Sequence, residues 1–162
     1  MYYFAYGSNM SSRRLQRRIN ATKIGNGKLL KYQLRFHKIG KKDGTGKCDI
    51  YFTNRLSDYI YGVVFEIEGT DKEKLDHIEG KGYGYDSIKI SVEMEEGIIQ
   101  AHTYMATNID ATLRPLDWYK EHVLRGAIEN VFDKKYIEMI KSVPTIIDTD
   151  CNRKKDELSI YV

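Results

Sequence analysis

The sequence has few of the residues that build covalent or metal-held frameworks, with only two cysteines among 162 residues. Cys48 and Cys151 lie far apart and form no Cys-x-x-Cys pair, so neither a disulfide framework nor a thiolate metal site is predicted. No apolar run approaches the roughly 18 residues that a membrane helix needs, and residues 1–10 lack the apolar centre of a signal peptide. We therefore expect a cytoplasmic protein with no membrane contact.

The sequence also lacks a strong charge of one sign, because 26 Lys and Arg residues stand against 23 Asp and Glu residues, a formal net charge of +3. That balance does not indicate a nucleic-acid-binding protein. The arginines between Arg13 and Arg18 leave weak RNA binding open as an alternative, but on a helix they would spread over a solvated face. No metal site is predicted, since none of the histidines has a neighbour at metal-ligand spacing: His37, His77, His102 and His122.

The length fits one domain spanning residues 1–162, and the 41% hydrophobic and 30% charged residues are typical of a globular domain with a real core. Thirteen tyrosines are unusual. Tyrosine combines apolar surface with a hydroxyl, so both a tyrosine-lined polar pocket and a tyrosine-rich β structure explain this number. We find no repeat and no interdomain linker, and residues 145–162 read as a C-terminal tail.

Alternation of apolar and polar residues predicts a series of strands. Gly62 is a possible bulge, and Glu96-Gly97 separates the two strands of a β-hairpin. The strands are expected at Tyr2–Tyr6, Leu30–Phe36, Asp49–Thr53, Tyr59–Ile67, Ser87–Glu93 and Ile98–Ala106, with Leu158–Val162 as a possible final strand.

Helices are predicted where apolar residues recur every three or four positions after a capping residue. The expected starts are Ser11 or Ser12, Thr70 or Asp71, Pro115, and Asp133. Strands outnumber helices and the last two helices are consecutive, so we predict an α+β fold in which a mixed sheet or barrel carries helices on its outside.

The turn Tyr6-Gly7-Ser8-Asn9 lies between a predicted strand and the start of a helix. Gly7 permits a positive φ or a close backbone approach, and unpaired N–H groups at a helix start favour an anion. The turn is therefore a candidate site for a carboxylate, a phosphate or an oxyanion. A simple capped turn explains the same residues.

Glu79 comes at the end of a short predicted helix, directly before Gly80, Gly82 and Gly84. A carboxylate there faces the negative end of the helix dipole, and burial would add desolvation. Both effects favour the protonated form and suit a group that accepts and returns a proton near neutral pH. An exposed glutamate in a glycine-rich loop is the alternative.

Taken together, these segments resemble one family, the γ-glutamylcyclotransferases and related AIG2-like proteins. The octapeptide Tyr3-Phe4-Ala5-Tyr6-Gly7-Ser8-Asn9-Met10 is similar to the N-terminal signature of that family. Leu75-Asp76-His77-Ile78-Glu79-Gly80 resembles the segment that ends in the family's catalytic glutamate. Further similar segments follow in order, at Tyr61–Phe65, Thr103–Met105, Tyr119-Lys120 and Gly126-Ala127, and the resemblance runs from Tyr3 to about Val143.

The resemblance implies a small mixed β-barrel with flanking helices. It implies cyclisation of a γ-glutamyl amide to 5-oxoproline with release of an amine, without a cofactor or a metal. Glu79 is the implied catalytic acid/base. The implied substrate-binding residues are Tyr3, Phe4, Ala5, Tyr6, Gly7, Ser8, Asn9 and Tyr119.

The segment Lys81-Gly82-Tyr83-Gly84-Tyr85 lies where the family varies, so the leaving amine stays open. A γ-glutamyl amino acid, a γ-glutamyl amine of the γ-glutamyl-lysine type and an antibiotic-biosynthesis intermediate all fit. A non-catalytic member that binds a small carboxylate or a protein partner is a further alternative. We expect a small-molecule γ-glutamyl substrate, no nucleic-acid partner, and a monomer or a homodimer.

Overall fold

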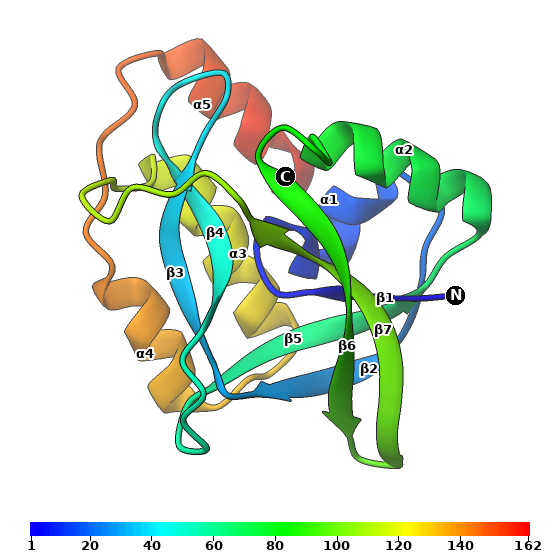
Figure 1. Ribbon diagram of the computed structural model, residues 1–162. Coiled ribbons are helices and arrows are strands. Elements are labelled where there is room, and N and C mark those ends of the chain that lie inside the picture. Colours follow the sequence, from blue (N-terminus) through cyan, green and yellow to red (C-terminus); the bar gives the residue numbers. More distant parts are fainter.

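The centre of the fold is a closed five-stranded barrel, seen in a computed structural model that describes residues 1–162 (Figure 1). Strand β1 pairs antiparallel with β5 and parallel with β7, so the barrel is mixed. This arrangement with flanking helices confirms the predicted α+β class. The strands follow one another around the barrel as β1 (Tyr2–Ala5), β5 (Tyr59–Glu66), β2 (Thr22–Leu30), β6 (Tyr85–Met94) and β7 (Gly97–Ala106).

A separate two-stranded sheet is formed by β3 (Tyr32–Ile39) and β4 (Gly46–Phe52). The predicted strand Leu30–Phe36 is wrong at its start, because Leu30 ends β2 and Lys31 turns the chain with a φ of 70°. The register of β3 against β4 shifts between Arg35 and Lys38, so consecutive residues of β3 are buried there instead of alternating.

Gly62 is not a bulge, although it was a candidate for one. It pairs regularly with Gly27 of β2, and the register shift of that ladder lies instead between Lys23 and Gly25. A Cβ on Gly62 would lie 2.5 Å from the ring of Phe4. A Cβ on Gly27 would overlap the side chain of Val92. Close packing in the barrel core therefore requires glycine at both positions.

The helices lie outside the barrel, and α1, α2 and α5 gather at one end of the molecule (Figure 1). Every α-helix except α5, in the tail, was predicted from the sequence. None of the helices has the length and apolarity required to cross a membrane. Their bounds are α1 (Ser12–Gln16), α2 (Gly69–Glu79), α3 (Asp117–Glu129), α4 (Lys134–Ser142) and α5 (Cys151–Leu158), with short 3-10 helices η1 (Ser8–Met10) and η2 (Ser159–Tyr161).

One of the predicted helix starts is confirmed and two are wrong. The confirmed one is Asp133, which caps α4 because its carboxylate accepts hydrogen bonds from two backbone N–H groups. The N-cap of α2 is Glu68, which precedes both predicted caps, Thr70 and Asp71. Helix α3 begins at Asp117 and not at Pro115, because the carbonyl of Pro115 accepts a hydrogen bond from a tail residue.

The tail forms a helix where a final strand was considered. Asp150 caps α5 through the N–H of Arg153, and the buried carboxylate of Asp148 binds the Arg153 guanidinium and, at 2.6 Å, the indole N–H of Trp118. Residues Leu158–Val162 continue this helix into η2. The closed barrel has no free edge to which another strand could be added.

Candidate active site

The turn that follows β1 places a set of backbone donors at one end of the barrel. Gly7 is the N-cap of η1, and the first hydrogen bond of that helix runs from Met10 N–H to the Gly7 carbonyl at 3.0 Å. The N–H groups of Ser8 and Asn9 precede this bond, as the first donors of a helix do. Gly7 has a φ of −115°, so close approach, not positive φ, requires glycine. A Cβ there would lie 2.9 Å from Cβ of Cys48.

Glu79 is the last residue of α2, and its carboxylate reaches the same end of the barrel. Gly80 ends the helix in the left-handed conformation, with a φ of 72°. The Oε1 atom of Glu79 accepts hydrogen bonds from Asn9 Nδ2 at 3.0 Å and from Arg18 Nη1 at 3.1 Å. Both donors bind the same oxygen, and Oε2 has no hydrogen-bond donor in the protein.

Asn9 joins three elements of the site. Its amide group is buried and donates to Glu79 on α2 and, at 3.1 Å, to the hydroxyl oxygen of Tyr3 on β1. Burial, together with the nearby Glu79 carboxylate, raises the pKa of Tyr3. Tyr3 is therefore a neutral hydroxyl, and its own hydrogen has no acceptor in the protein.

Four further tyrosines surround the turn, and their hydroxyls are tied to the backbone or to a carboxylate. Tyr6 donates to the Tyr104 carbonyl at 2.6 Å, and Tyr104 donates to Asp76 at 2.7 Å. Tyr85 donates to the Cys48 carbonyl at 2.6 Å, while the Tyr119 hydroxyl accepts the Cys48 N–H at 3.0 Å.

Burial raises the pKa of each of these four phenols. The wall of the site is therefore uncharged, polar and fixed at neutral pH.

The structure brings most of the expected residues into one cavity. Two exceptions are Phe4 and Ala5, which are fully buried in the barrel core and do not line it. Its lining consists of Tyr3, Tyr6, Gly7, Ser8, Asn9, Cys48, Glu79, Tyr85, Tyr104 and Tyr119.

Sequence analysis missed several contributors to this site. Arg18 was interpreted as part of a solvated face, yet it pairs with Glu79. Arg14 also pairs, with Glu157 of the tail helix at 2.7 Å. Nothing in the sequence around Cys48 indicates a role in the site. Tyr85 and Tyr104 are among the thirteen tyrosines whose number indicated a polar pocket.

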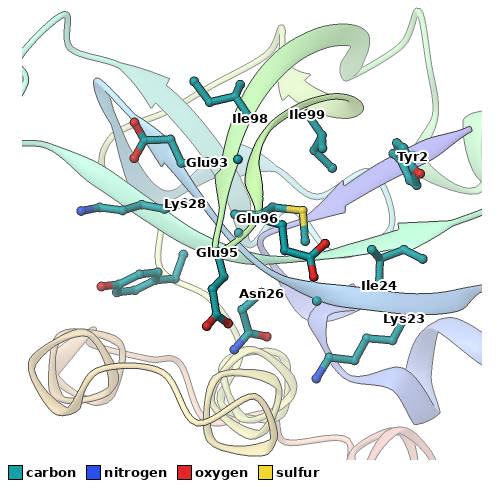
Figure 2. Close-up of a pocket in the computed structure, with 15 residues that line it drawn as sticks. Tyr2, Lys23, Ile24, Asn26, Lys28, Glu93, Glu95, Glu96, Ile98 and Ile99 are labelled. Atoms are coloured by element: carbon teal, nitrogen blue, oxygen red, sulfur yellow. The ribbon is translucent and has the colours of Figure 1, made fainter.

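A larger cavity, of about 770 Å³, lies elsewhere, between β2 and the β6–β7 hairpin. Figure 2 shows that the carboxylates of Glu93, Glu95 and Glu96 point in different directions and do not converge on one point. In no part of the chain are three or more His, Cys, Asp or Glu side chains grouped to hold a metal ion. The chemistry therefore concentrates in the smaller cavity at Glu79.

Comparison with known proteins agrees with this geometry. The model of the AIG2-like family matches residues 59–140, which include Glu79. The human γ-glutamylcyclotransferase is 31% identical over 148 residues, covering 87% of this chain and 77% of the human protein. The chain belongs to the AIG2-like family.

Solved structures extend the match of this AIG2-like protein to the whole chain. A γ-glutamyl cyclotransferase structure superposes with a TM-score of 0.87 at 27% identity, covering 98% of both chains. An uncharacterised human protein superposes with a TM-score of 0.86 at 26% identity, covering 99% of this chain and 98% of its own. These matches confirm the predicted barrel with flanking helices.

Proposed function

We propose that this AIG2-like protein cyclises a γ-glutamyl amide to 5-oxoproline and releases the amine, with Glu79 as the general acid/base. The observation that carries the proposal is the position of the Glu79 carboxylate, which is anchored through Oε1 and free at Oε2 in the cavity that contains the Gly7–Asn9 turn. The match to curated γ-glutamylcyclotransferases supports the same reaction class.

The substrate carries its own nucleophile, the α-amino group, which is an ammonium at neutral pH. Glu79 removes one proton, and the free amine attacks the γ-carbonyl carbon to form a five-membered ring. As the tetrahedral adduct collapses, the carbon–nitrogen bond to the leaving group breaks and the proton on Glu79 passes to the leaving nitrogen. The ring nitrogen loses its second proton, which the released amine takes up. The carboxylate is therefore regenerated.

The turn supplies the donors that this reaction requires. In this proposal, the free N–H groups at the start of η1 hold the substrate's α-carboxylate or the oxyanion of the adduct. Loss of one oxyanion donor typically costs about 3–4 kcal/mol of barrier, and holding amine and carbonyl in contact contributes ~7–11 kcal/mol. Tyr3 and Tyr119 add neutral hydroxyls to the same cavity.

The test is 5-oxoproline release by Glu79→Gln beside the wild-type protein. Gln keeps the shape and can still accept from Asn9 and Arg18, but it cannot take a proton. We expect kcat to fall by ~10²–10⁴-fold, the usual contribution of a general base. The matched control is Glu73→Gln, an exposed residue of the same helix, which we expect to retain full activity.

A Glu79→Gln variant that retains more than about a tenth of the wild-type kcat removes Glu79 from the base role. Thermal unfolding of both variants shows whether a loss of activity is a loss of fold. Wild-type protein that releases no 5-oxoproline from any γ-glutamyl compound favours the non-catalytic alternative.

A further inference from the structure

The arginine-rich α1 segment, residues 12–18, joins the tail of the chain to the Glu79 carboxylate. Helix α1 lies next to α5 and α2 at one end of the molecule (Figure 1). Arg14 Nη1 donates to Glu157 Oε2 of α5 at 2.7 Å, and Arg18 Nη1 donates to Glu79 Oε1 of α2 at 3.1 Å. The backbone N–H of Arg18 still bonds at 2.9 Å to a carbonyl of α1, so both arginines move with that helix.

The contact with the tail is part of a polar cluster that is largely buried. Glu157 Oε2 also lies 3.2 Å from Nε2 of His122, a residue of α3 that is fully buried. The other ring nitrogen of His122 lies 2.8 Å from the hydroxyl of Tyr161. The side chain of Arg14 is only 11% exposed. A charged hydrogen bond in such surroundings is stronger than a loose ion pair at the surface.

The α1 segment depends on such contacts for its position. Helix α1 has five residues, and Leu15 is its one buried side chain. An isolated helix of this length is not stable in water, so its place is set by what packs against it. Glu157 is the one carboxylate within 4.0 Å of the Arg14 guanidinium. Without it, a largely buried cation would lack a partner and would move toward water, taking Arg18 away from Glu79.

We propose that Glu157 is a positioning residue for the cyclisation, because it holds Arg14, and with it α1, where Arg18 orients the carboxylate of Glu79. This inference rests on the proposed function. Glu157 does not line the cavity at Glu79, so its effect on the reaction passes through Arg18. The tail, residues 145–162, is then part of the framework of the active site.

The test is a double-mutant cycle on 5-oxoproline release, measured with the γ-glutamyl compound that the wild-type protein turns over fastest. The variants are Glu157→Met, Arg18→Met and the two combined. Methionine removes the carboxylate and the acceptor but keeps a high helix propensity. Asp156→Met is the matched control, because it removes one negative charge from an exposed residue of the same helix.

We expect Glu157→Met to lower kcat by ~3–10-fold, with the loss of the charged hydrogen bond of Arg18 as its upper limit. KM should stay within about twofold of wild type, because orientation of the proton acceptor acts on the transition state and not on substrate binding. In the Arg18→Met background, Glu157→Met should lower kcat by less than about twofold, since the bond through which it acts is already absent. Asp156→Met should keep the wild-type kcat.

Urea unfolding of every variant separates a loss of activity from a loss of fold. If Glu157→Met does not fold, Glu157→Gln, which keeps the acceptor and loses the charge, takes its place in the same cycle.

Two results would overturn the inference and leave the proposed function standing. A folded Glu157 variant with the wild-type kcat shows that the tail contributes to stability alone. Losses that multiply in the double variant show that Glu157 acts by a route that does not include Arg18. Wild-type protein that releases 5-oxoproline from no γ-glutamyl compound overturns the proposed function itself, and this inference with it.

Discussion

Gly126→Ala tests whether α3 positions the Gly7–Asn9 turn of the proposed active site. Gly126 faces η1, and a Cβ there would lie 2.7 Å from Cβ of Met10 and 3.0 Å from the backbone nitrogen of Ser11. Asn130 joins the same two elements, donating to the Gly126 carbonyl at 2.7 Å and to the Met10 carbonyl at 3.2 Å. The added methyl group therefore meets atoms that are held in place and cannot rotate away.

The magnitude follows from these distances. Carbon atoms in contact prefer about 3.5–4.0 Å, so η1 must move on the order of 1 Å. Overpacking lowers the free energy of unfolding by roughly 1–3 kcal/mol, and the higher helix propensity of alanine raises it by about 1 kcal/mol. The net destabilisation is about 0–2 kcal/mol. Movement of η1 displaces Met10 and Asn9 together, and Asn9 Nδ2 donates to Glu79 Oε1 at 3.0 Å. A misplacement of about 1 Å costs up to 10²-fold in rate.

The assay pairs kcat/KM for 5-oxoproline release with urea unfolding. We expect Gly126→Ala to lose ~10–100-fold in kcat/KM while remaining folded. Gly69→Ala is the control, because Gly69 begins α2 and a Cβ there meets nothing within 4 Å. It should be fully active. A Gly126→Ala protein with kcat/KM within twofold of wild type refutes the view that α3 fixes the turn.

Two further predictions concern the charged groups around the site. Arg18→Met should lower kcat/KM about tenfold, because one charged hydrogen bond that orients Glu79 is lost. The control Arg17→Met, at an exposed neighbouring residue, should keep the wild-type kcat/KM. Equal losses of kcat/KM in the two variants would exclude the orienting role of Arg18. Acid should destabilise the protein, because hydrogen bonding with His122 and Arg14 holds the pKa of Glu157 at about 2 and burial lowers the pKa of His122. The pKa of each group is lower in the folded than in the unfolded protein, so each contributes to the free energy of unfolding at neutral pH. The contribution of His122 is lost as the pH falls below about 6.5, and that of Glu157 as the pH falls from about 4.5 toward 2. Melting temperatures of Glu157→Gln and wild type measured from pH 7 to pH 3 check this, and parallel curves would contradict it.

Local patterns determined the strands and helices whose signals lie within a few residues. The β6–β7 hairpin pairs without a register shift around its Glu96-Gly97 turn, and Asp133 caps α4 with its own carboxylate. The position of Glu79 at a helix end was also readable, because Gly80 directly follows it and glycine adopts the left-handed end conformation. These features depend on neighbours along the chain, so the sequence alone is sufficient to predict them.

Strand β2 shows where local signals fail. Gly25 and Gly27 disfavour a strand by propensity, and the strand was not predicted. The barrel requires a glycine at position 27, since a Cβ there would overlap the side chain of Val92 on β6. Tertiary packing thus overrides local preference.

The site itself was decided partly by sequence and partly by long-range packing. The octapeptide and Glu79 were identifiable as a pair, but only the fold places Arg18 on Glu79 across 61 residues and sets Cys48 against Gly7. It also turns Phe4 into the core, although its neighbour Tyr3 lines the cavity. Sequence determined which residues can carry the chemistry. The closed barrel decided which of them meet, because contacts between distant segments depend on register and packing that no local pattern records.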